Sequence, residues 1–172
     1  MNTYTQDKLS KILELHRLFL ENDPSGVQAN LSGANLEGVN LKGAILKVAN
    51  LKGATLVDAN LEDAILLGAN LKGAKLTHAN LKGAKLAYAN LEGVNLKGAN
   101  LKGANLDYSC WPLWCGSFDV DVDRKVAAQL AYHFCRLDCD DPEYIGARNA
   151  IVKFANKFHR IGEPRIPEIE EI

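Results

Sequence analysis

Leucine recurs at every fifth position through the middle of the chain, from Leu31 to Leu106, without a gap. Two residues before each Leu stands Ala, replaced only by Val39 and Val94, and the residue directly before Leu is most often Asn. The position two residues after Leu is Gly in ten of the sixteen cases. The repeating unit is therefore ANLxG, and it runs from residue 29 to residue 108.

A stride of five fits neither an α-helix nor a flat strand. Five residues advance an α-helix by about 500°, so successive Leu would drift by about 140° around the cylinder. On a strand an odd stride sends neighbouring Leu to opposite faces. The pattern predicts that each pentapeptide ends in a turn, so that Leu and the preceding Ala face the inside of a coil. Gly suits corners with positive φ, and because Val48 occupies the same slot we expect the corner conformation to vary.

The uninterrupted ANLxG tandem resembles the pentapeptide-repeat family. That resemblance implies a β-solenoid, a right-handed quadrilateral β-helix with four pentapeptides per turn and about four coils over residues 29–108. It also implies a choice of roles, because some relatives protect topoisomerases by resembling DNA in shape and negative charge.

A twenty-residue turn sorts the outward positions into four faces, and three of these faces are polar. The fourth face carries apolar side chains, interspersed with Lys47, Lys85, Asn105 and Asp107. This candidate patch consists of Ile45, Val48, Ile65, Leu67, Ala87, Tyr88 and Tyr108. Contiguous exposed apolar residues are normally covered, so we expect either a flanking segment of the same chain or a partner or second subunit to pack there.

The N-terminal segment, residues 1–28, is predicted to be a helix that caps the first coil. Thr3 with Gln6 offers a capping box, apolar residues then recur at helical spacing, and the run Asn22–Gly26 ends the pattern. A solenoid needs such caps because its terminal coil exposes unpaired backbone. His16, on the apolar side, is expected to be packed rather than to bind a ligand.

Residues 109–172 are predicted to form a C-terminal cap with about two α-helices and a loose tail. The first helix is expected to open at Asp119 or Asp121, and the second at Asp141 followed by Pro142 at the first helical position. Gly162, Pro164 and Pro167 then end the helical pattern. A tail that pairs as an edge strand is the alternative.

Composition and charge exclude several classes of protein. A hydrophobic fraction of 47% over 172 residues is typical of a folded domain. The net charge of −1 does not indicate a protein that binds nucleic acid, because such proteins carry a clear excess of basic residues. Within residues 29–108 nine Lys stand against six acidic residues, which argues against a DNA mimic. No signal peptide or membrane span is apparent, so a cytoplasmic location is expected.

Candidate chemistry is sparse. Cys110, Cys115, Cys135 and Cys139, with His133, suggest zinc ligation, but their spacing lacks a tight CxxC knuckle. Free thiols are the first expectation, and a metal ion or a disulfide are the alternatives. Asp119, Asp121 and Asp123 lack the Gly and Glu of a calcium loop, and no catalytic motif is visible.

The sequence therefore predicts a non-enzymatic protein-interaction or scaffold protein without cofactors, metal ions or a small-molecule substrate. Its partner is expected to be another protein or a second copy, and neither nucleic acid nor membrane. The alternatives are a DNA-mimic regulator or protector of a topoisomerase, and a metal-binding C-terminal module.

Overall fold

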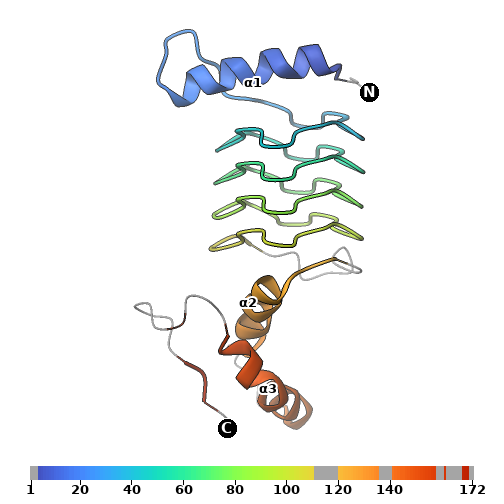
Figure 1. The fold of residues 1–172 in the computed structure, drawn as a ribbon, viewed down its shortest axis with the longest axis vertical. Coiled ribbons are helices and arrows are strands. Elements are labelled where there is room, and N and C mark those ends of the chain that lie inside the picture. The colour runs from blue at the N-terminus through green and yellow to red at the C-terminus, as the bar shows by residue number, and fades with distance from the viewer. Residues whose placement is uncertain (1–3, 111–119, 136–140, 158–160, 162–167, 171–172) are drawn as a thin grey trace. The chain divides into compact units, whose positions relative to one another are not determined.

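The computed structural model describes residues 4–110, 120–135, 141–157, 161 and 168–170, with the side chain of His133 left out. Within these ranges the chain forms the helices α1 (Gln6–Leu20), α2 (Arg124–Cys135) and α3 (Pro142–Ala155), with a solenoid between α1 and α2 in the sequence (Figure 1). The chain divides into two compact units, Met1–Asp121 and Val122–Ile172. Each unit is described by itself.

The repeats wind as a coil in which residues twenty apart pair in parallel. Asn30 pairs with Asn50, Asn50 with Asn70, and Asn70 with Asn90, and the other sides of the coil follow the same step. Twenty residues per turn means four pentapeptides per turn, as the resemblance implies. The paired segments are single bridge residues instead of strands, because each pentapeptide turns before a second consecutive residue can pair.

The chemistry of each pentapeptide explains its sequence. The N–H of Ala34 donates to the Leu31 carbonyl at 3.1 Å and closes a four-residue turn, in which Gly33 takes φ 63. The side chain of the residue before Leu braces the next turn: Asn50 Oδ1 accepts from the Lys52 N–H at 3.2 Å. Asn favours such local hydrogen bonds to a backbone N–H two residues on, which accounts for its place in the repeat.

The corner conformation does not vary, contrary to the expectation raised by Val48. Val48 has φ 56, close to Gly53 at φ 65, and the other non-glycine corners also have positive φ. The Val48 N–H donates to the Leu67 carbonyl at 2.8 Å, as the corner glycines donate to the next coil. These coil-to-coil hydrogen bonds outweigh the preference of a β-branched residue for negative φ.

The interior of the solenoid is a column of leucine, as predicted. All sixteen Leu from Leu31 to Leu106 are buried, and none is more than 3% exposed. The small residues two positions earlier are buried beside them, except that Val39 and Ala44 are half-buried. At about 1.5–3 kcal/mol for each fully buried Leu, this column is the main source of stability in the first unit.

Helix α1 lies across the N-terminal end of the solenoid (Figure 1) and buries Leu9 and His16 completely. Its N-cap lies two residues later than expected: the cap is Thr5, whose Oγ1 accepts from the Lys8 N–H at 3.3 Å. Thr3, the predicted cap, lies outside the described residues. The helix ends at Leu20, and Asn22 with φ 61 begins the return of the chain toward the first coil.

The second unit packs α2 against α3 around its own small core. Asp123 Oδ1 accepts from the Val126 N–H at 3.0 Å and opens α2, whereas Asp121 pairs with Asn100 of the coil and Asp119 lies outside the described residues. Asp141 caps α3 ahead of Pro142, as predicted. The buried cluster consists of Tyr132, Cys135, Val152, Ala155 and Ile169.

Residues 168–170 are not loose, although the sequence predicts a loose tail. Ile169 is only 7% exposed and belongs to the core of the second unit. Its main chain forms hydrogen bonds with Asn156 in both directions. These bonds outweigh the entropy that a free tail would retain.

Candidate functional site

The coil places the predicted patch residues on one side of the solenoid, in columns that run from turn to turn. The bridge column contains Ile45, Ile65, Lys85 and Asn105, since Ile45 pairs with Ile65, Ile65 with Lys85, and Lys85 with Asn105. The corner column contains Val48, Gly68, Tyr88 and Tyr108, and every one of these residues has positive φ. The twenty-residue period is what brings these distant positions together.

Four of the seven patch residues are exposed. Ile45 is 43% and Val48 38% exposed, and the two tyrosines are more open, with Tyr88 at 62% and Tyr108 at 59%. Ile65 and Leu67 are half-buried. The exposed apolar surface is therefore weighted toward the two ends of the fourth face.

Ala87 does not contribute to this surface, because it is only 7% exposed. Its column holds Leu67 one turn before it and Asp107 one turn after it. Neighbouring turns lie about 4.8 Å apart, so longer side chains from both sides cover a single methyl group. The sequence pattern identifies an outward position, but it does not give the exposure of a small residue there.

Tyr88 and Tyr108 stack on each other. Their ring centroids lie 4.8 Å apart and their planes differ by 14°. Both residues hold a left-handed backbone, at φ 59 and φ 57. Every described corner shares that conformation, so it is the stacking of the two exposed rings that makes this pair the most distinctive part of the patch.

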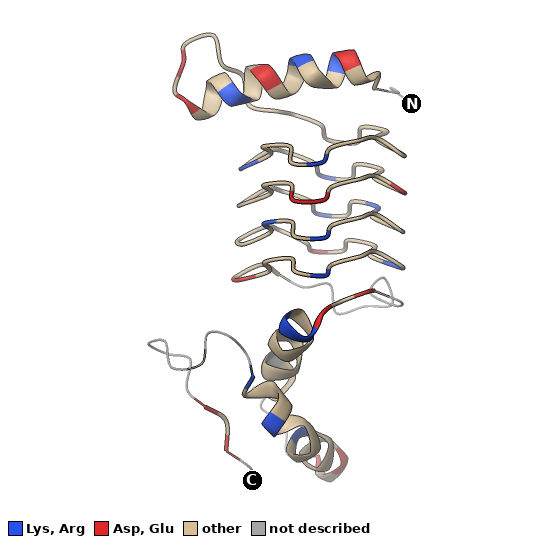
Figure 2. Cartoon of the chain, in the orientation of Figure 1, with Lys and Arg blue, Asp and Glu red and all other residues tan. Residues whose placement is uncertain are grey.

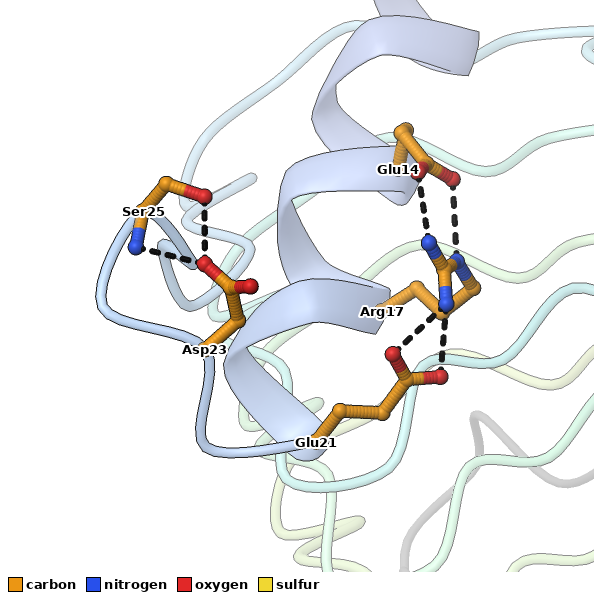
Figure 3. Close-up of polar contacts among 5 residues, drawn as sticks. All are labelled: Glu14, Arg17, Glu21, Asp23 and Ser25. Carbon is orange, nitrogen blue, oxygen red and sulfur yellow. Dashed lines mark hydrogen bonds and ion pairs between the residues drawn. The ribbon is translucent and has the colours of Figure 1, made fainter.

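An open groove of about 340 Å³ lies where α1 meets the first coil. Its lining includes Leu13, Glu14 and Arg17 from the helix and Ile45 from the patch. Arg17 donates to Glu14 at 2.8 Å and to Glu21 at 2.6 Å (Figure 3), and the bond from Arg17 holds the pKa of the Glu14 carboxyl below its ordinary value. On the following loop, Asp23 accepts from the Ser25 main chain and hydroxyl, which lowers the pKa of Asp23.

His16 joins α1 to the first coil through both ring nitrogens. The Ala29 N–H donates to Nδ1 at 3.1 Å, and Nε2 lies 3.0 Å from the Lys47 carbonyl oxygen. Since Nδ1 accepts, Nε2 must carry the proton and donate, so the ring is neutral. Burial lowers the pKa of His16 and favours the same state. His16 is a packed histidine, as the sequence indicates.

Charged side chains of both signs lie on the coils, and several of them pair between turns. Lys42 and Lys82 both contact Glu62, at 3.0 and 3.8 Å, and the bond from Lys42 lowers the pKa of Glu62. Lys72 pairs with Glu92 at 2.8 Å, and Lys102 with Asp121 at 2.8 Å. Figure 2 shows both signs of charge distributed over the coils. The described coil surface therefore presents no continuous acidic or basic track.

The cysteines that are described carry free thiols. Cys110 is exposed and continues an Asn column, where its Sγ donates to Asn90 Oδ1 at 3.1 Å, and Cys135 is buried in the second unit. Burial raises the pKa of the Cys135 thiol. Cys115 and Cys139 lie outside the described residues, and no group of three potential metal ligands occurs among the residues that are described.

Sequence reasoning missed the two residues that hold the tail of the second unit, Arg148 and Asn156. The available signal was the alternation of acidic and apolar residues in Glu168, Ile169 and Glu170, which is typical of a half-buried extended segment.

None of the described helices is long and apolar enough to span a lipid bilayer.

Comparison with known proteins gives matches over the repeats. A family profile described as pentapeptide repeats matches in eight copies, over residues 29–66, 44–83 and 74–110. No curated protein sequence gives a significant match.

Three solved structures illustrate the similarity. A pentapeptide repeat protein from the Arabidopsis thaliana thylakoid lumen is 29% identical, with a TM-score of 0.50 over 73% of this chain and 76% of that one. The pentapeptide repeat protein Rfr23 from the cyanobacterium Cyanothece 51142 is 43% identical, with a TM-score of 0.37 over 56% of this chain and 58% of that one. QnrB1, a plasmid-mediated fluoroquinolone resistance protein, is 15% identical, with a TM-score of 0.41 over 63% of this chain and 64% of that one. The chain thus spans less than two thirds of the last two proteins. The repeat matches support the right-handed β-solenoid that the sequence predicts.

Proposed function

Because its repeats place this chain in the pentapeptide-repeat family, we propose that it is a non-enzymatic protein-interaction or scaffold protein whose fourth face contacts a protein partner. The observation that carries the proposal is the exposed patch on an otherwise polar coil, whose most exposed residues are the stacked Tyr88 and Tyr108. Aromatic residues are enriched at the energetic centres of protein interfaces. The packed leucine column keeps this surface rigid, so little entropy is lost on binding.

The charge pattern supports a protein partner over DNA mimicry. A mimic of DNA needs carboxylates at the density of phosphates, about one charge per 1.7 Å of helix axis, whereas Glu62 and Glu92 are neutralised by neighbouring Lys. A gyrase supercoiling assay tests the mimic directly. Inhibition of supercoiling at stoichiometric protein would favour mimicry over the function proposed here.

The location proposed for the protein is the cytoplasm, and the partner is expected to be encountered there. Neither a metal ion nor a small-molecule substrate forms part of the proposal.

The experiment compares capture from native cell extract by the wild type and by an Ile45→Glu, Tyr88→Glu variant. Both substitutions fall on exposed side chains, so the coil should remain folded. The matched control, Lys75→Glu with His78→Glu, places acidic residues in the equivalent bridge and corner positions of a polar face of the coil. A protein retained by the wild type and the control but lost with the patch variant is then purified and its affinity measured directly.

We expect at least a tenfold weaker affinity for the patch variant, because hot-spot substitutions typically cost about 2 kcal/mol or more. Equal affinity of all three proteins would reject the fourth face as the contact surface. Loss of circular dichroism from the patch variant would instead indicate that the patch is internal packing.

A further inference from the structure

The second unit holds its own tail in the way that peptide-binding proteins hold an extended ligand. Asn156 Nδ2 donates to the Ile169 carbonyl at 2.9 Å, and the Ile169 N–H donates to Asn156 Oδ1 at 3.0 Å. One side-chain amide thus satisfies both main-chain groups of a single tail residue. This bidentate contact requires an extended segment but does not read its side chains.

Arg148 provides a second main-chain contact beside the first. Its Nη2 donates to the Glu170 carbonyl at 2.8 Å, while its Nε donates to the carbonyl of Cys135 at 3.1 Å. Cys135 is the last residue of α2, so Arg148 also binds a carbonyl that the end of that helix leaves free. Arg148 as a residue is only 8% exposed, and its hydrogen bonds to two carbonyls fix the guanidinium in position.

The side chain of Ile169 supplies the specificity. It enters the cluster formed by Tyr132, Cys135, Val152 and Ala155, whereas the flanking Glu168 and Glu170 are exposed. The site therefore recognises an aliphatic residue, and a polar residue at that position would be buried without partners.

The charges of α3 and of the tail are complementary. Apart from Glu143 in the first turn of α3, the charged residues from Pro142 to Lys157 are Arg148, Lys153 and Lys157. The last five residues of the tail contain three Glu and no basic residue. An acidic segment with an aliphatic centre therefore fits this surface by charge as well as by shape.

We propose that α2 and α3 form a docking site for such a segment, and that residues 168–170 of a second copy of this chain occupy it in trans. The contact is small, with one anchor side chain and three hydrogen bonds to the tail main chain, so the tail within the same chain can leave without unfolding the helices. The identical segment of another copy makes the same contacts, which is the low-cost route to dimers known as domain swapping. The proposal adds a self-association site to the interaction function proposed above, and it depends on none of the fourth-face residues.

The test uses two full-length variants that complement each other. Ile169→Asp disables the tail but leaves the site, and Asn156→Asp disables the site but leaves the tail. The second change is nearly isosteric, yet its carboxylate faces the Ile169 carbonyl and the acidic tail. Sedimentation of each variant alone should give a monomer, whereas their mixture should give a one-to-one complex. The control is a mixture of the Ile169→Asp variant with a double variant that carries both Ile169→Asp and Asn156→Asp. This mixture should stay monomeric, since neither chain has a working tail.

The wild type should dimerise only at higher concentration than the complementary pair, by about tenfold or more, because the tethered tail competes at an effective concentration near the millimolar range. A complementary mixture that remains monomeric up to that concentration would overturn the proposal. Failure here leaves the fourth-face experiment unaffected, because that experiment does not involve the tail.

A measurement on the unmodified chain covers the case in which Ile169→Asp does not fold. The synthetic peptide Ile-Pro-Glu-Ile-Glu-Glu-Ile, residues 166–172, is added in excess, and hydrogen exchange of the Ile169 amide is followed. Displacement of the tail releases that amide from Asn156 and should speed its exchange at least tenfold, while a peptide with Asp at the central Ile should have no effect. Unchanged exchange with millimolar peptide would equally reject a site that accepts the segment in trans.

Discussion

The corner residue of each pentapeptide bears the main conformational cost of this solenoid. Every described corner has positive φ, a region that costs most residues about 1–2 kcal/mol relative to Gly. Val48 bears the largest cost, because its branched Cβ is least compatible with φ 56. The coil keeps this conformation because the corner N–H pairs with the next turn.

Replacing Val48 with Gly should therefore stabilise the first unit by about 1 kcal/mol, the relief of strain exceeding the added entropy of the unfolded chain. The matched change is Gly53→Ala, since a Cβ at Gly53 meets nothing within 4 Å and the cost is purely conformational. The Gly53→Ala variant should have a free energy of unfolding that is lower by about 1 kcal/mol. Urea unfolding checks both, and a stability of Val48→Gly at or below the wild type would show that contacts of the valine side chain offset its strain.

His16 gives the second prediction at this scale, through its protonation. Burial lowers the pKa of His16 in the folded protein, so between that pKa and the unfolded value of about 6.5 the unfolded chain binds more protons. The contribution of His16 to the free energy of unfolding is thus complete above about pH 6.5, and it falls as the pH is lowered toward the pKa of the folded protein. The slope of this decline is no steeper than about 1.4 kcal/mol per pH unit. Free energies of unfolding measured between pH 7.5 and pH 5 should show this decline.

His16→Gln is the control for that experiment, because Gln does not titrate and the chain holds three other His. The difference between wild type and variant isolates the effect of His16. A difference that does not change with pH would mean that folding leaves the pKa of His16 at its unfolded value, and would contradict the prediction.

At the scale of elements, α1 is fixed to the solenoid by main-chain contacts as well as by side chains. The Val27 N–H donates to the Leu15 carbonyl at 2.9 Å, and the chain passes so close to the helix that a Cβ at Gly26 would meet main-chain atoms of Phe19. The segment that holds Gly26 and Val27 therefore cannot shift unless α1 moves with it.

Gly26→Ala should accordingly destabilise the first unit by about 1–3 kcal/mol, the range for inserting an atom into a packed site. Gly146→Ala in α3 is the matched control: a Cβ there meets nothing within 4 Å, and Ala is the better helix former by about 1 kcal/mol, so the second unit should become more stable. Thermal unfolding of the two variants separates the effects. A neutral Gly26→Ala would show that the loop relaxes away from α1 at little cost.

The sequence predicts these elements unevenly, and the reasons are physical. The cap of α3 is predictable because Asp141 and Pro142 act locally. The start of α2 is not, since Asp121 and Asp123 are equivalent as caps until the coil engages Asp121 through Asn100. The docking of Ile169 depends on Asn156 and Arg148, and no local pattern connects these residues with the tail.

For the molecule as a whole, the spacing of the repeat predicts a coil with the leucines inside, whereas the four pentapeptides per turn are what the family resemblance implies. The patch residues are predictable as outward positions, yet their exposure is not, as Ala87 and Tyr88 show. Exposure depends on the side chains one turn above and below, and these differ from coil to coil. Regularity therefore defines the fold of this chain far more than it defines its surface chemistry.

Two separate cores should give the whole chain two unfolding transitions. The first unit depends on the leucine column and the second on the cluster that Tyr132 and Val152 form between α2 and α3. Leu61→Ala should lower the first transition by about 2–5 kcal/mol, the usual cost of a large cavity in a core. Val152→Ala should lower only the second, by about 2 kcal/mol, since less volume is removed.

Calorimetry of the wild type and both variants measures these shifts, and residue-resolved hydrogen exchange assigns each transition to its unit. In a solenoid the energy of each coil is shared with its neighbours only, so the loss at Leu61 should spread along the first unit and not reach the amides of α3. A Leu61→Ala variant whose α3 amides exchange faster by the same factor as its coil amides would show that the two cores unfold together as one cooperative structure.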